Sequence, residues 1–305
     1  FVASHFMDQD CTPPRNTSLS NGQLVTQACI WEATAPKPGN VHPAASFPDA
    51  CYEDFVTSAQ AIGPAMEAAA SQALGDTVWQ AVSATRSVVS SNTNLGLILL
   101  LAPLASVPQE QPLRAGLSQV LESLSAEDSN TFYKAIRLTQ PGGLGEADEF
   151  DVQEAPPNDL LVAMQEASSW DLIARQYCHG FKDLFDLLSP WLERGIDNGW
   201  TLSQTIVHCH IQCMATFPDS LIGRKCGLPI ARESQERAKA VLDNGSPTRD
   251  KYQQAVNELD HWLRADGHRR NPGTTADMIG AALFIGLRHG TIDANLSVST
   301  AGDNR

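Results

Sequence analysis

The spacing of apolar residues constrains this chain most, because they recur every three or four positions along most of its length. Three stripes follow this spacing: Phe55, Ala59, Ile62, Met66 and Ala73; Leu202, Ile206, Val207, Ile211 and Met214; and Tyr252, Val256, Leu259 and Leu263. This period is typical of amphipathic helices, and alternating strand patterns are nearly absent. We therefore predict an all-α fold, a single bundle-like domain of about ten to thirteen helices.

The limits of the domain are predicted from where the helical pattern starts and stops. Residues 1–23 are expected to form an N-terminal tail, residues 24–290 the helical domain and residues 291–305 a C-terminal tail. Six residues precede Met7, which we expect to be the natural start of the protein.

Polar residues at fixed spacing mark the beginnings of helices. Thr201 with Gln204 has the spacing of a capping box, in which each side chain accepts a hydrogen bond from the other residue's amide. Ser125 with Asp128 is a second such start, and Thr274 opens the last helix.

Charge and hydropathy limit the partners of this chain. Its formal net charge of −14 argues against nucleic acid, whose binding proteins usually present a basic face. No apolar run is long enough to span a membrane. Seven scattered cysteines favour free thiols in a reducing cytoplasm. We expect a cytoplasmic protein whose anionic ligands are held by a few local cations, helix N-termini or Mg²⁺.

A stiff corner, Pro36-Lys37-Pro38-Gly39, lies between Glu32 and His42. The prolines fix the backbone on both sides of Lys37, and Gly39 permits a turn that other residues resist. Lys37 is thus predicted to be presented from a rigid loop, as functional cations often are. The alternative is an ordinary helix end followed by a surface turn.

Asn92, Thr93 and Asn94 precede an apolar helix that starts near Leu95. All three are good N-cap residues, and Gly96 allows close approach of a ligand. An anion held at the helix N-terminus and simple capping are both consistent with this pattern.

The start of the last helix has a similar composition. Gly273, Thr274 and Thr275 offer amides and hydroxyls to phosphate oxygens, and Asp277 follows in the first turn. Arg224 adds a guanidinium, which suits bidentate phosphate recognition. Ordinary capping and a surface turn are the alternatives for these segments.

Asp171, Arg175, His179, Asp183 and Asp186 follow one another at steps of three or four residues. On a single helix they would form one polar ladder. Such a ladder is either a solvated face with modest ion pairs or a polar seam inside a bundle. In the second case Asp183 and Asp186 would bind Mg²⁺ together with substrate phosphates.

Four segments, in the same order, resemble motifs of the triphosphoribosyl-dephospho-coenzyme A synthase family. They are Glu32 with Pro36-Lys37-Pro38-Gly39 and Val41; Asp49 with Phe55 and Ser58; Asn92-Thr93-Asn94-Leu95-Gly96; and Pro272-Gly273-Thr274-Thr275-Ala276-Asp277. Asp219 with Arg224 resembles a further pair in that family. The resemblance extends over most of the predicted domain.

This resemblance implies transfer of a 5-triphosphoribosyl group from ATP to the ribose 2′-hydroxyl of 3′-dephospho-coenzyme A, with release of adenine. The implied partners are therefore ATP and a small cofactor precursor, and Mg²⁺ is expected to enter with ATP. A homodimer is an alternative to a monomer.

Residue types and motif positions suggest roles in that reaction. Catalysis is assigned to Glu32 or Asp49, as the carboxylate at the sugar, and to His42, as a proton donor. Substrate contacts are expected from Lys37, Gly39, Asn92, Thr93, Asn94, Gly96, Arg224, Gly273, Thr274 and Thr275. Magnesium contacts are expected from Asp183, Asp186 and Asp277.

Departures from the family pattern leave other functions open. Asn94 stands where the family has histidine, and His42 where aspartate is common. A related enzyme that uses a nucleotide with a different acceptor, such as a tetrahydromethanopterin-type cofactor precursor, is one alternative. A non-catalytic all-α binding or scaffold protein is another.

Overall fold

The computed structural model of this protein describes residues 19–139 and 152–298, and the outer parts of both predicted tails lie outside this range. Within it the chain forms fourteen α-helices, one more than the predicted upper limit, and the only β-type pairing is two isolated bridges between residues 42 and 50. The helices are α1 (Asn21–Thr34), α2 (Tyr52–Ala68), α3 (Leu74–Val88), α4 (Leu95–Ala105), α5 (Leu113–Glu122), α6 (Ala126–Thr139), α7 (Leu160–Ala167), α8 (Leu172–Cys178), α9 (Ser189–Asp197), α10 (Leu202–Thr216), α11 (Ser220–Cys226), α12 (Leu228–Leu242), α13 (Asp250–Arg264) and α14 (Gly273–His289). A 3-10 turn, η2 (Ala69–Ser71), and a π-helical turn, η3 (Leu184–Leu188), complete the list. The all-α prediction is confirmed.

Helix starts follow the predicted capping in two cases. The Thr201 hydroxyl accepts from the Gln204 amide at 3.2 Å, and the Gln204 side chain accepts from the Thr201 amide at 3.0 Å. The carboxylate of Asp128 accepts from the amide and hydroxyl of Ser125 at 2.9 and 2.6 Å. The last helix differs, because α14 begins at Gly273 with Pro272 in the cap position.

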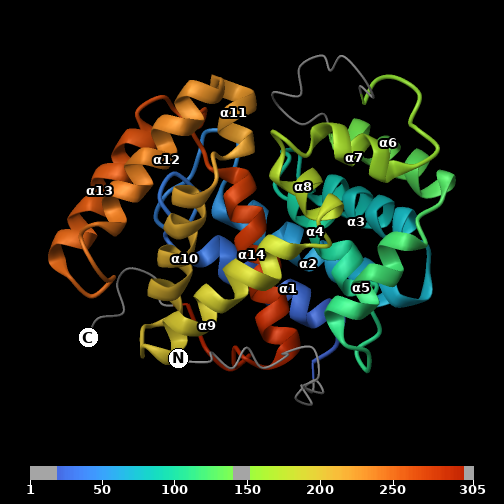
Figure 1. The fold of residues 1–305 in the computed structure, drawn as a ribbon, viewed down its shortest axis with the longest axis horizontal. Coiled ribbons are helices and arrows are strands. Elements are labelled where there is room, and N and C mark those ends of the chain that lie inside the picture. The colour runs from blue at the N-terminus through green and yellow to red at the C-terminus, as the bar shows by residue number, and fades with distance from the viewer. Residues whose placement is uncertain (1–18, 140–151, 299–305) are drawn as a thin grey trace, which may run out of the picture.

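Two central helices, α1 and α14, separate the rest of the fold into two sides. Figure 1 shows α10–α13 on one side of them and α3–α8 on the other. Nearly all of α14 is buried, and so is every residue of α4 except Gly96, as expected for core helices. A second, smaller hydrophobic cluster joins α10, α11, α12 and α13. No helix in the described ranges has the length and hydropathy to cross a bilayer.

The predicted ladder from Asp171 to Asp186 is broken, which corrects the assumption of a single helix. Helix α8 ends at Cys178, and both Gly180 and Phe181 adopt positive φ angles, 58° and 59°. Phe181 is fully buried, so packing of its ring offsets the cost of this left-handed backbone. The chain then restarts in η3, and residues on either side of the break no longer share one helix face.

A buried arginine joins three parts of the fold. Arg288 of α14 donates to the side-chain oxygen of Asn21 at 3.0 Å and to the carbonyls of Val107 and Pro108 at 3.0 and 2.6 Å. Burial lowers the pKa of Arg288 to about 10, so it stays charged at neutral pH. Asn21 also donates to the Ala105 carbonyl at 2.9 Å. The ends of α1, α4 and α14 are thus held by one polar network.

We expect Arg288→Leu to lower the free energy of unfolding by about 3 kcal/mol, because several buried acceptors lose a charged donor. Urea denaturation measures this change. Arg232→Leu, on an exposed position of α12, is the matched control and should change stability by no more than ~0.5 kcal/mol. Equal stabilities of the two variants would contradict the structural role of Arg288.

Candidate active site

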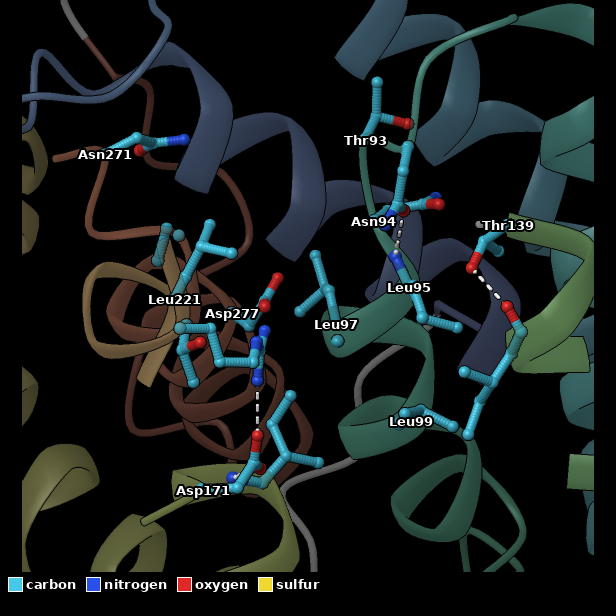
Figure 2. Close-up of a pocket in the computed structure, with 18 of the residues that line it drawn as sticks. Thr93, Asn94, Leu95, Leu97, Leu99, Thr139, Asp171, Leu221, Asn271 and Asp277 are labelled. Atoms are coloured by element: carbon cyan, nitrogen blue, oxygen red, sulfur yellow. Dashed lines mark hydrogen bonds and ion pairs between the residues drawn. The ribbon is translucent and has the colours of Figure 1, made fainter. Parts of the chain in front are cut away.

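A cavity of about 1050 Å³ lies where α1, α4, α8, α11 and α14 meet. In Figure 2, Asp277, Asp171 and Leu221 stand on one side of it, and Asn94 and Leu97 stand on the other. Ligand pockets for drug-sized molecules measure roughly 300–1,000 Å³. This cavity therefore has room for more than one small substrate.

The lysine of the Pro-Lys-Pro-Gly corner points into the protein. Its ammonium lies 2.9 Å from a carboxylate oxygen of Glu32 and also donates to the backbone carbonyls of Glu32 and Ala35. The Lys37 side chain is fully buried. A charge taken out of water must be paired and hydrogen bonded, and this arrangement meets both conditions.

The corner itself is anchored on α13. Gly39 has a φ of 75°, and its amide donates to Asp260 at 2.7 Å. Arg264 binds Asp260 at 2.8 Å and the Asn40 carbonyl at 2.5 Å. A side chain at Gly39 would lie 2.9 Å from Leu263. Both the backbone angle and the close packing therefore require glycine here.

Two carboxyl groups, those of Glu32 and Asp277, line the cavity and are close enough to interact electrostatically. Their surroundings differ. Glu32 ends α1 and faces Lys37, whereas Asp277 lies in the first turns of α14. Burial, followed by the negative charge of Glu32, raises the pKa of Asp277 well above its ordinary value. Burial and these two carboxyls also raise the pKa of the Cys29 thiol, which argues against a thiolate nucleophile.

Asp277 fits in this position because Gly96 has no side chain. A Cβ at Gly96 would lie 2.1 Å from an Asp277 carboxylate oxygen. Asp277 is largely enclosed by protein, but part of it faces the cavity. The first turns of α4 and α14 therefore meet at this carboxyl group.

The polar residues before α4 are connected to neighbouring helices. The hydroxyls of Thr93 and Ser58 lie 2.6 Å apart, and the Asn94 side chain donates to Thr85 at 3.2 Å. Asn92 accepts from the first amide of α4 at 3.3 Å. Thr93, Asn94 and Asn92 all line the cavity, in positions held by hydrogen bonds within the protein.

At the start of α14, some polar residues line the cavity and others hold the helix in place. Gly273 and Thr274 line the cavity. The amide and hydroxyl of Thr275 instead donate to buried Asp219 at 2.7 and 2.8 Å. Asp219 also accepts from the Ile222 amide at 2.9 Å, as the cap of α11. Thr275 and Asp219 together fix the start of α14 against α11.

Cations line one wall of the cavity. Arg224 lies 2.5 Å from Asp171, the residue that caps α8, and its buried Nε has no hydrogen-bond partner in the described part of the chain. Lys225 and His268 line the same wall, and His268 lies 3.6 Å from Asp49. The guanidinium and ammonium groups of this wall suit phosphate oxygens.

The chain matches the profile of the ATP:dephospho-CoA triphosphoribosyl transferases over residues 19–295. It belongs to this family. A curated relative from Pseudomonas syringae pv. tomato, named "Probable 2-(5''-triphosphoribosyl)-3'-dephosphocoenzyme-A synthase", is 30% identical over 107 residues. That match spans 35% of this chain and only 36% of the relative. A solved structure from Archaeoglobus fulgidus, whose name assigns it to the triphosphoribosyl-dephospho-CoA synthases, superposes with a TM-score of 0.60 at 26% identity and covers 78% of this chain and 100% of that one.

Most of the site residues expected for a triphosphoribosyl transferase meet at the cavity, although they are far apart in the sequence. Those that line it are Glu32, Asp49, Asn92, Thr93, Asn94, Gly96, Arg224, Gly273, Thr274 and Asp277. Those outside its lining are Lys37, Gly39, His42, Thr275, Asp183 and Asp186. Lys37 contacts the lining residue Glu32, and Gly39 binds Asp260 of α13, so both residues hold the corner next to the cavity.

The magnesium ligands expected for this transferase family are not brought together. Asp183 pairs with Arg175 at 2.8 Å, and Asp186 pairs with Arg114 at 2.7 Å, both away from the cavity that holds Asp277. The Arg114 hydrogen bond lowers the pKa of Asp186. No three metal-binding side chains cluster within the described residues. The break after α8 separates Asp183 and Asp186 from the helix that carries Asp171, and each pairs with an arginine. Their role in binding Mg²⁺ stays a prediction.

In this member of the transferase family, His42 makes a local hydrogen bond and does not line the cavity. Its Nδ1 accepts from the Ala44 amide at 3.3 Å, in the loop that follows the corner. Burial, followed by the charges of Arg264 and Lys37, lowers the pKa of His42, so it is neutral at pH 7. The sequence-based role of proton donor at the sugar stays a prediction.

Several lining residues were not singled out from the sequence. Arg86 ends α3 near Ser90, and His268 and Asn271 lie in the connector between α13 and α14. Asn271 accepts from Asn40 at 2.5 Å, which joins this connector to the corner. The basic composition of residues 264–273 was the one available signal for these residues.

We expect Lys37→Met to lower the free energy of unfolding by about 3–5 kcal/mol, because Glu32 would be left as an unpaired buried charge. Chemical denaturation tests this, with Lys239→Met in the exposed pair with Glu236 as control. A Glu32→Met, Lys37→Met double variant should recover much of the loss. A loss below 1 kcal/mol for Lys37→Met alone would show that the pair is not the support we describe.

Asp277 should make stability fall as pH rises. Its folded pKa lies above the unfolded value of about 3.9, so the folded chain binds the proton more tightly, and stability declines once pH exceeds that value. Asp277→Asn removes this decline, and the variant should gain on the wild type as pH rises above about 4. Urea denaturation across this range measures the difference, with the exposed Asp243→Asn as control. Parallel curves for wild type and Asp277→Asn would contradict the expectation.

Proposed function

We propose that this protein transfers a 5-triphosphoribosyl group from ATP to the ribose 2′-hydroxyl of 3′-dephospho-CoA and releases adenine. Family membership supports this substrate pair. The observation that carries the proposal is the pair of cavity carboxyls, Glu32 and Asp277, held in opposite electrostatic surroundings. Two neighbouring carboxyls in different surroundings, one paired with a buried lysine and one with a raised pKa, can take separate base and acid roles.

The reaction demands charge stabilisation at the sugar and a proton at the base. Breaking the bond between C1′ and the adenine nitrogen develops positive charge on the ribose, which an ionised Glu32 beside Lys37 would stabilise. Asp277, whose pKa is raised by burial and by Glu32, is the better suited of the two to hold a proton and would donate it to the leaving adenine. Glu32 would then accept the proton that the attacking 2′-hydroxyl releases. One proton is given and one taken, and its return to Asp277 restores the starting state.

Glu32 is favoured over Asp49 as the carboxylate at the sugar. Glu32 is buried and paired with Lys37, whereas the Asp49 side chain is 63% exposed. A desolvated charge acts more strongly on a transition state than an exposed one. Asp49 at the rim is better suited to meet Mg²⁺ that arrives bound to the phosphates of ATP.

The triphosphate of ATP would bind best at the cation wall, formed by Arg224, Lys225 and His268. Arg224 and Lys225 of α11, together with His268 of the connector before α14, line this part of the cavity. Gly273 and Thr274 add the start of α14 to the same region. Lys37 acts instead as a positioning residue, because its ammonium is committed to Glu32 and two carbonyls.

The test is adenine release from MgATP with and without 3′-dephospho-CoA, followed by the mass of the product. Wild-type protein should release adenine only when the acceptor is present. Gly96→Ala should reduce the rate by about 100-fold, because displacing Asp277 by roughly 1 Å disturbs the reacting geometry. Gly223→Ala is the matched control, since a methyl group there meets its nearest atom at 4.0 Å.

Other outcomes identify other functions. Stabilisation by ATP without acceptor-dependent adenine release would point to a different acceptor, such as a tetrahydromethanopterin-type precursor. Neither stabilisation nor turnover would favour a non-catalytic binding protein and contradict the proposal.

A further inference from the structure

The cavity has a second part whose chemistry differs from that of the carboxyls and cations. Leu99 of α4, Tyr133 and Ile136 of α6, and Ala163 and Met164 of α7 line it. This apolar branch lies between α4, α6, α7 and α8, whereas the cation wall belongs to α11 and the connector before α14. The cavity thus runs from a charged end to one where apolar side chains predominate and Thr139 and Glu166 add polar groups.

The walls of the apolar branch are held in place by contacts of their own. The Tyr177 hydroxyl donates to the Leu99 carbonyl at 2.6 Å, and the Tyr177 ring packs edge-on against Phe132 with centroids 6.2 Å apart. Thr139 donates to the Ile136 carbonyl at 2.8 Å, and Figure 2 shows Thr139 and Leu99 on the same side of the cavity. The branch is therefore a preformed surface, held from the α8 side through Tyr177.

A phosphate group would bind poorly in the apolar branch. The lining residues of α6 and α7 include no cation and one acid, Glu166, so a phosphate there would lose its hydration without gaining a positive partner. Methyl and methylene groups, in contrast, gain about 25 cal/mol for each Å² of apolar surface that they bury. The branch therefore selects the least charged part of whichever substrate occupies it.

We infer that the apolar branch binds the amide-linked aliphatic arm of the acceptor, and that it determines which acceptors are used. This inference rests on the proposed function, which puts the acceptor ribose near Glu32 and Asp277 and the ATP phosphates at the cation wall. ATP has no such arm. The dephospho-CoA molecule carries one beyond its diphosphate, so the acceptor is the substrate whose chemistry changes from charged to aliphatic along its length, as the cavity does.

Filling the branch with a larger side chain tests the inference. Ala163→Phe should raise the KM for 3′-dephospho-CoA by about tenfold, the effect expected from overpacking, and leave the KM for ATP within about twofold. Ala167→Phe, one turn further along α7 at another lining position, should act in the same direction. Ala240→Phe, at an exposed position of α12, is the matched control.

Direct binding separates failure of the branch from failure of the proposed function. Calorimetric titration of 3′-dephospho-CoA should show binding to wild type and to Ala240→Phe, and a loss of about tenfold in affinity for Ala163→Phe. Thermal stabilisation by MgATP should be equal in all three proteins. Wild-type protein without turnover, but with this pattern of binding, would refute the reaction and keep the branch. Equal acceptor affinities, absence of acceptor binding to wild type, or a matching loss of ATP binding in Ala163→Phe would overturn the branch assignment.

Discussion

The buried ion pair between Lys37 and Glu32 is the interaction on which the rest of the site depends. Glu32 lies at the end of α1, where an unpaired carboxylate would lose its hydration without compensation. The Pro-Lys-Pro-Gly corner returns the chain at once, so that Lys37 reaches back beneath the carboxylate that precedes it by five residues. Because Gly39 and Asp260 anchor this corner on α13, the corner also connects the end of α1 to α13.

The second carboxyl group near this pair, that of Asp277, suits proton transfer but lowers the stability of the fold. Asp277 is buried among negative groups, which raises its pKa and makes its ionised form unfavourable in the folded state. The fold tolerates it because Gly96 leaves space and because α14 is otherwise almost entirely buried. A position that lowers stability and faces a cavity is characteristic of functional rather than structural residues.

Periodicity and capping were sufficient to predict the fold class and several helix starts, because both depend on residues close together in the sequence. The single helix expected for Asp171 to Asp186 was wrong, because its interruption depends on residues far apart in the sequence. Its spacing was helical, but burial of Phe181 stabilises a left-handed turn that no local pattern reveals. The inward orientation of Lys37 was equally hidden, since lysine is rarely buried and the carboxylate that permits it was assigned to the substrate. Most of the motif residues converge on one cavity, and their common location depends on long-range packing of α1, α4 and α14.

The charge of the protein restricts how such a cavity can bind a triphosphate. With a net charge of −14, long-range attraction of an anionic nucleotide is unfavourable. Of the basic residues at the cavity, Arg224 already forms an ion pair with Asp171, and His268 lies beside Asp49. Binding must therefore come from short-range contacts in a desolvated space, where a hydrogen bond to phosphate is stronger than in water. Mg²⁺ carried by the nucleotide would weaken its repulsion by the carboxylates Glu32 and Asp49. On these grounds the acidic lining is better matched to MgATP than to the free nucleotide, and an excess of free ATP should compete poorly with its magnesium complex.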